Sequence, residues 1–128
     1  GEWPAQGSTK LISREWIAKA RARWDTYVSK NGEKPPEFAS TVAGLDVGEF
    51  GTDSNVLCFR SGGYVERLLA WSGVDPLITA DRAAAQVRQR RCCRINVDAT
   101  GVGAGVVPQL QRSGIPTNGT DSSSTLNM

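Results

Sequence analysis

The chain contains no histidine, and this absence excludes several kinds of chemistry. Serine and cysteine nucleophiles that depend on a histidine base cannot be assembled from these residues. The three cysteines, Cys58, Cys92 and Cys93, match no zinc-binding spacing without histidine partners. We therefore expect them to be reduced thiols, in the core or near the surface, in a cytosolic setting.

A long hydrophobic run is also absent. Hydrophobic residues make up 39% of the 128, and no apolar run approaches the roughly 20 residues that span a bilayer. The first residues, Gly1-Glu-Trp-Pro4, do not resemble a signal peptide. We expect one soluble α/β domain with no membrane segment, and the lack of an initiator methionine indicates a piece of a longer protein.

Neither sign of charge predominates, since 15 basic and 13 acidic residues leave a net charge of only +2. The distribution of charge along the chain is more informative, because residues 82–94 contain five arginines and no acidic residue. One interpretation is an ordinary solvated helix face. The other is an edge that binds phosphates beside the acidic residues described below.

Periodic apolar residues predict a helix over residues 10–29. Ile12, Trp16, Ala20, Trp24 and Val28 form one stripe, which should dock on another surface, and Ser13 is the expected cap. Turn residues at 31–36 then interrupt the pattern. We therefore predict a linker segment over residues 1–36 and a core over residues 37–128.

The remaining pattern predicts strands at 41–47, 55–60, 64–71 and 94–98, and another beginning near 115. A helix over 75–91 should turn Leu77, Ala80, Ala84 and Val87 inward, and a short helix over 104–113 should end at Gly114 in the left-handed conformation. This order fits a ribonuclease-H-like mixed sheet, in which an antiparallel meander adjoins parallel strands. The first strand would be central, and the strand at 94–98 would run parallel to it.

Asp46 and Asp98 each end a predicted strand, and this topology places them side by side. Two carboxylates there could bind Mg²⁺ and polarise a phosphodiester. Other interpretations exist, because Asp46-Val-Gly48 also resembles the phosphate loop of sugar kinases and actin-like ATPases, and an aspartate after a strand is often a turn residue. The glycines after Asp98 do not form a dinucleotide fingerprint, since the last required glycine falls on Val106 or Pro108.

Three stretches carry a family resemblance: Gly44-Leu-Asp-Val-Gly-Glu-Phe-Gly-Thr-Asp-Ser-Asn-Val56, Trp71-Ser-Gly-Val-Asp75 and Val97-Asp-Ala-Thr-Gly-Val-Gly-Ala-Gly-Val-Val107. They resemble the nuclease domain of the large terminase subunit of tailed bacteriophages. The beginning, with Gly1-Glu-Trp-Pro4 and Leu11-Ile-Ser-Arg-Glu-Trp-Ile17, resembles the junction between that family's ATPase domain and its nuclease. The resemblance covers residues 1 to about 116.

The resemblance implies a motor that packages viral double-stranded DNA in the cytoplasm of a bacterial host, with a portal protein and a small terminase subunit as partners. Its nuclease would cut DNA with two Mg²⁺ or Mn²⁺ ions. Asp46 would bridge both metals, Asp98 would bind one, and Asp53 would assist through water. Binding to DNA would come mainly from arginines that contact phosphates.

The family carries a further acid on a helix after the fifth strand, and here the only later acid is Asp121. The resemblance therefore predicts a C-terminally truncated core with an incomplete site. A catalytically inactive module for DNA binding or packaging assembly is the alternative. An actin-like ATPase lobe would need a second lobe that 128 residues cannot supply.

Overall fold

The computed structural model describes residues 11–49 and 53–120, which form parts of two compact units, residues 1–34 and 35–128. The predicted boundary after residue 36 lies close to this division. None of the helices in the described ranges is both long and apolar enough to cross a bilayer.

The first unit is built around α1 (Arg14–Asn31), and its start follows the predicted cap. The Ser13 hydroxyl accepts a hydrogen bond from the Trp16 N–H at 3.1 Å, which satisfies one of the free donors of the first turn. The helix ends at Gly32, whose φ of 76° is accessible to glycine at little cost. Within the described chain no residue of α1 is buried and Trp16 is 61% exposed, so the docking of its apolar stripe on another surface stays a prediction.

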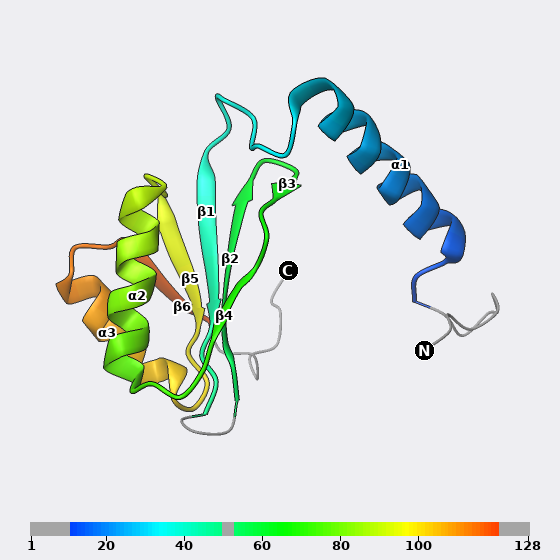
Figure 1. The fold of residues 1–128 in the computed structure, drawn as a ribbon. Helices are drawn as coiled ribbons and strands as arrows, with labels where there is room; N and C mark the ends of the chain where they lie inside the picture. Colours follow the sequence, from blue (N-terminus) through cyan, green and yellow to red (C-terminus); the bar gives the residue numbers. More distant parts are fainter. Residues whose placement is uncertain (1–10, 50–52, 121–128) are drawn as a thin grey trace. The chain divides into compact units, whose positions relative to one another are not determined.

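The second unit contains a six-stranded mixed sheet with the order β3-β2-β1-β5-β6, and β4 also pairs with β2 (Figure 1). The strands are β1 (Thr41–Asp46), β2 (Asn55–Ser61), β3 (Tyr64–Val65), β4 (Leu69–Trp71), β5 (Arg94–Asp98) and β6 (Thr117–Thr120). Strand β1 is central, β2 is antiparallel to it on one side, and β5 is parallel to it on the other. The predicted fold class, a ribonuclease-H-like mixed sheet, is confirmed.

One predicted strand, 64–71, is wrong as a single element. Val65 pairs with Arg60 and Leu69 pairs with Leu57, so three residues on this side oppose two on β2. One extra residue forces a bulge and divides the segment into β3 and β4. The intervening Glu66 is held by Arg90, whose Nε lies 2.8 Å from the Glu66 Oε2.

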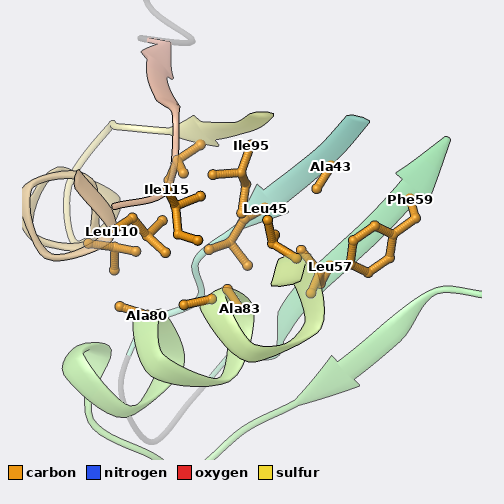
Figure 2. Packing of buried hydrophobic residues seen from close by; sticks show 13 residues of the cluster. Ala43, Leu45, Leu57, Phe59, Ala80, Ala83, Ile95, Leu110 and Ile115 are labelled. Carbon is orange, nitrogen blue, oxygen red and sulfur yellow. The ribbon is translucent and has the colours of Figure 1, made fainter. Parts of the chain in front are cut away.

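Helices α2 (Pro76–Gln89) and α3 (Gly103–Arg112) pack on one face of this sheet (Figure 1). Alanines of α2 lie against Leu45 and Leu57 of the strands, and small side chains let the helix approach closely (Figure 2). The predicted inward position of Leu77 is wrong, because this residue is 52% exposed. The buried face of α2 begins two residues later, at Thr79 and Ala80.

The short helix α3 ends much as its sequence predicts. Gly114 has a φ of 79°, and the Ile115 N–H donates to the Leu110 carbonyl at 3.1 Å, which satisfies a carbonyl of the last turn. Ile115 then enters the core and the chain continues into β6, which lies parallel to β5. The Asp98 end of β5 is therefore supported from both sides.

Candidate functional site

Asp46 and Asp98 are the last residues of two adjacent parallel strands. The residues before them, Leu45 and Val97, are paired in the β1–β5 register and are both buried in the core. Because side chains alternate along a strand, Asp46 and Asp98 project from the opposite face of the sheet. The topology thus places the two carboxylates at neighbouring strand ends and on the same face, as the sequence predicts.

Asp98 is held by the segments that surround it. Its Oδ1 accepts a hydrogen bond from the Thr100 N–H at 3.0 Å, and the next residue, Ala99, donates its N–H to the Thr120 carbonyl at 2.6 Å. The start of α3 lies directly against this turn, because a Cβ added to Gly103 would come within 1.8 Å of the Asp98 carbonyl oxygen. Asp98 is therefore half-buried at a rigid strand-to-helix turn.

Asp46 is exposed, and contacts at Gly48 hold the loop that follows it where the loop leaves the sheet. Two residues later, a Cβ on Gly48 would lie 2.5 Å from the Ser54 carbonyl oxygen, so the two arms of the loop are in close contact. The Gly48 N–H donates to the Oδ1 of Asn55 at 3.0 Å. From the sequence, Asn55 is predicted only to begin a strand. The sequence does contain a sign of its role. Asn55 is an amide residue, and it shares the core-facing positions of its strand with Leu57 and Phe59.

Asp53 lies in this same loop and is exposed. Its N–H donates to the Glu49 carbonyl at 3.1 Å, and its backbone packs against Gly48. Within residues 11–49 and 53–120, no group of three or more histidine, cysteine, aspartate or glutamate residues is placed to hold a metal ion. Asp53 therefore does not complete a cluster with the strand-end pair, and Asp121 lies outside the described residues.

The carboxylates of Asp46 and Asp98 are of the type that a hard divalent cation prefers, but the described residues do not supply a third ligand beside them. Carboxylate oxygens are the ligands that Mg²⁺ and Mn²⁺ prefer, and two carboxylates on rigid strands suit them. Mg²⁺ commonly binds through one or two carboxylates together with water and phosphate oxygens. The described residues thus carry part of the donor set that such a site needs.

Three of the five arginines of residues 82–94 do not line the carboxylate end of the sheet. Arg88 donates to the Ser113 carbonyl at 2.6 Å, while Arg90 pairs with Glu66 and lies 4.2 Å from the centre of the Phe59 ring. Arg94 begins β5, four residues and roughly 13 Å from Asp98. These three arginines therefore do not form the predicted phosphate-binding edge directly beside the carboxylates.

Two arginines nevertheless share the face that carries the carboxylates. Arg60 and Arg94 are both paired with Val42, on opposite sides of β1. Each neighbours a buried residue of its own strand, so alternation directs both side chains to the same face as Asp46 and Asp98. Positive charge thus lies at one end of this face and negative charge at the other.

The three cysteines are free thiols that differ in exposure: Cys58 and Cys92 are half-buried and Cys93 is exposed. Burial raises the pKa of the Cys92 thiol, which leaves less thiolate near neutral pH. We expect maleimide to modify Cys93 several-fold faster than Cys92 at pH 7, and Cys92 labelling to accelerate as the pH rises. Mass spectrometry of time points measures both rates, and a fast phase that survives Cys93→Ser would contradict the assignment.

No protein-family model matches the chain, and a search of curated proteins finds no match. Solved structures do resemble it. The nuclease domain of the large terminase subunit gp2 of bacterial virus Sf6 has a TM-score of 0.65 and 24% sequence identity, over 88% of this chain and 47% of that one. The large terminase nuclease from thermophilic phage G20c has a TM-score of 0.60 and 20% identity, over 70% of this chain and 48% of that one.

Some of these structures contain metals: a mutant of the Sf6 domain was solved with manganese and with calcium, and the G20c nuclease with bound zinc. The present chain spans about half the length of these solved domains. The chain therefore has the fold of the nuclease domains of phage large terminase subunits.

Proposed function

We propose that the chain carries the strand-end carboxylate pair of a metal-dependent DNA endonuclease domain, which belongs to a viral DNA-packaging terminase. The observation that carries this proposal is the register of β1 and β5, which brings Asp46 and Asp98 to adjacent positions on one face. The fold is shared with nuclease domains that were solved with divalent metals. In this proposal Asp46 would be the ligand common to both cations, Asp98 would hold one of them, and Asp53 would assist through water.

Mg²⁺ or Mn²⁺, two per complete site, would lower the pKa of an attacking water and neutralise the oxygen that leaves. The residues of this chain would hold and orient the cation. The Thr100 N–H fixes one oxygen of Asp98, so the carboxylate keeps a defined orientation. The backbones of Asp46 and Asp98 belong to strands, so less conformational entropy is lost when their carboxylates bind a cation.

The proposed substrate is double-stranded DNA, and the proposed partners are a portal protein and a small terminase subunit in the host cytoplasm. Arg60 and Arg94 support a polyanionic ligand, because they add positive charge to the face that bears the carboxylates. Phosphate contacts of this kind are largely independent of sequence and weaken steeply with salt.

A second candidate is a catalytically inactive module for DNA binding or packaging assembly. The observation that favours it is the lack of a cluster of three ligands among the described residues. The two candidates differ in one measurable property, since the inactive module would bind DNA without binding a metal.

Calorimetric titration with Mn²⁺ tests the proposal. We expect the wild-type chain to bind Mn²⁺, and Asp46→Asn and Asp98→Asn each to weaken binding at least about tenfold, since even residues that only support metal ligands contribute that much. Asp81→Asn is the matched control, because Asp81 is an exposed aspartate of α2 and its replacement makes the same change in charge. Its affinity for Mn²⁺ should remain that of the wild type.

Fluorescence anisotropy with a labelled DNA duplex completes the comparison. Absence of Mn²⁺ binding together with retained, salt-sensitive DNA binding would favour the inactive module. Equal Mn²⁺ affinity in Asp46→Asn and the wild type would remove Asp46 from the site.

A further inference from the structure

Asn55 is a buried polar residue at a position where the strand pattern calls for an apolar one. It is 4% exposed and lies on the same face of β2 as Leu57 and Phe59. Asparagine is unfavourable in strands, and a buried amide lowers stability unless its polar atoms are hydrogen-bonded. A buried asparagine here therefore calls for a specific explanation.

Both the oxygen and the nitrogen of the Asn55 side-chain amide form hydrogen bonds, and their partners lie in two different segments. The Oδ1 accepts from the Gly48 N–H at 3.0 Å, and the Nδ2 donates to the Trp71 carbonyl at 3.2 Å. Because one partner is a donor and the other an acceptor, only one orientation of the amide satisfies both. Asn55 thus ties the loop after β1 to the end of β4.

The bond to Gly48 lies just beyond the last pair of the β1–β2 ladder, Asp46 with Val56. The side chain of Asn55 in this way continues the ladder and sets the direction in which the chain leaves Asp46. The same loop carries Asp53, whose backbone packs against Gly48. Loss of the Asn55 amide would free the base of this loop and leave the Gly48 N–H without its acceptor.

We propose that Asn55 is a positioning residue for the carboxylate pair, which holds the backbone at Gly48 and thereby orients Asp46 to bind a divalent cation. This inference rests on the proposed function, because it concerns the same site. Residues that orient metal ligands without touching the metal commonly contribute about 10–100-fold to metal affinity.

Thr79 provides a matched control for the loss of a buried hydrogen bond. It is fully buried, and its Oγ1 accepts from the indole Nε1 of Trp71 at 3.2 Å. Thr79→Val removes a side-chain bond to the same tryptophan and leaves the Gly48 N–H bonded to Asn55. Comparison with Asn55→Ala therefore separates the positioning effect from a general loss of stability.

The test is Mn²⁺ calorimetry of the full chain, with amide hydrogen exchange of Gly48 measured by NMR. We expect Asn55→Ala to weaken Mn²⁺ binding about tenfold and to accelerate Gly48 exchange at least about tenfold. Thr79→Val should leave both properties within about twofold of the wild type. Asn55→Val repeats the test with a residue that favours strands and suits burial, so that a folded variant without the amide is available.

Unchanged Mn²⁺ affinity in Asn55→Ala and Asn55→Val, with wild-type binding intact, would overturn the inference and leave the proposed function standing. An equal loss of affinity in Thr79→Val would also overturn it, because the effect would then be one of stability. A wild-type chain that fails to bind Mn²⁺ would overturn the proposed function and this inference with it.

Discussion

Replacing Gly103 with alanine is expected to lower the free energy of unfolding by about 3 kcal/mol, the upper end of the usual effect of overpacking. The added Cβ would lie 1.8 Å from the Asp98 carbonyl oxygen and 3.0 Å from its carbonyl carbon. These are backbone atoms, so they cannot move aside by a change of rotamer. Either α3 or the backbone at Asp98 must therefore shift.

Urea unfolding followed by circular dichroism measures this effect, and Gly105→Ala is its control. Gly105 lies in the same helix, two residues later, and a Cβ there meets nothing within 4 Å. Alanine favours the helix over glycine by roughly 1 kcal/mol, so Gly105→Ala should be neutral or stabilising. Equal stabilities of the two variants would show that α3 does not press against Asp98 as described.

Replacing Phe59 with alanine is expected to lower the free energy of unfolding by about 4 kcal/mol, as is usual when a large core side chain is removed. Phe59 is 0% exposed, and it is one of the largest fully buried side chains. Its ring also supports the guanidinium of Arg90, which pairs with Glu66 at the bulge between β3 and β4. The substitution therefore leaves a cavity and removes a cation–π contact.

Phe38→Ala is the matched control, because Phe38 is 97% exposed and the chemical change is identical. Its effect on urea unfolding should be within about 0.5 kcal/mol. Phe59→Leu should fall between the two, since it keeps most of the buried apolar volume. A Phe59→Ala variant as stable as the wild type would mean that the core does not enclose this ring.

The order of the elements could be predicted from the sequence because it depends on local patterns, and the central pairing of the sheet was then inferred from that order. Strand and helix periodicities differ, and turn residues separate the segments. A parallel connection between β1 and β5 also restricts the possible topologies. Asp46 and Asp98 were identifiable because each is the last residue of a largely apolar strand, and adjacent parallel strands bring their carboxyl ends together.

Other features could not be read from patterns, because they depend on which segments meet. The 64–71 segment reads as one strand, and only its pairing with β2 shows the extra residue that divides it. The five arginines look like a candidate phosphate site, and only the fold shows that Arg88 and Arg90 bind within the protein. The exposure of Leu77 depends on where the sheet meets α2.

By itself the sequence determined the element order, the mixed sheet and the two strand-end aspartates, since apolar periodicity and turn chemistry act between near neighbours in the chain. Only the tertiary structure decided that Gly48 and Gly103 are close-packed and that Asn55 bridges two segments. Those contacts join residues brought together by folding. Their geometry follows from the packing of whole elements, which no local pattern encodes.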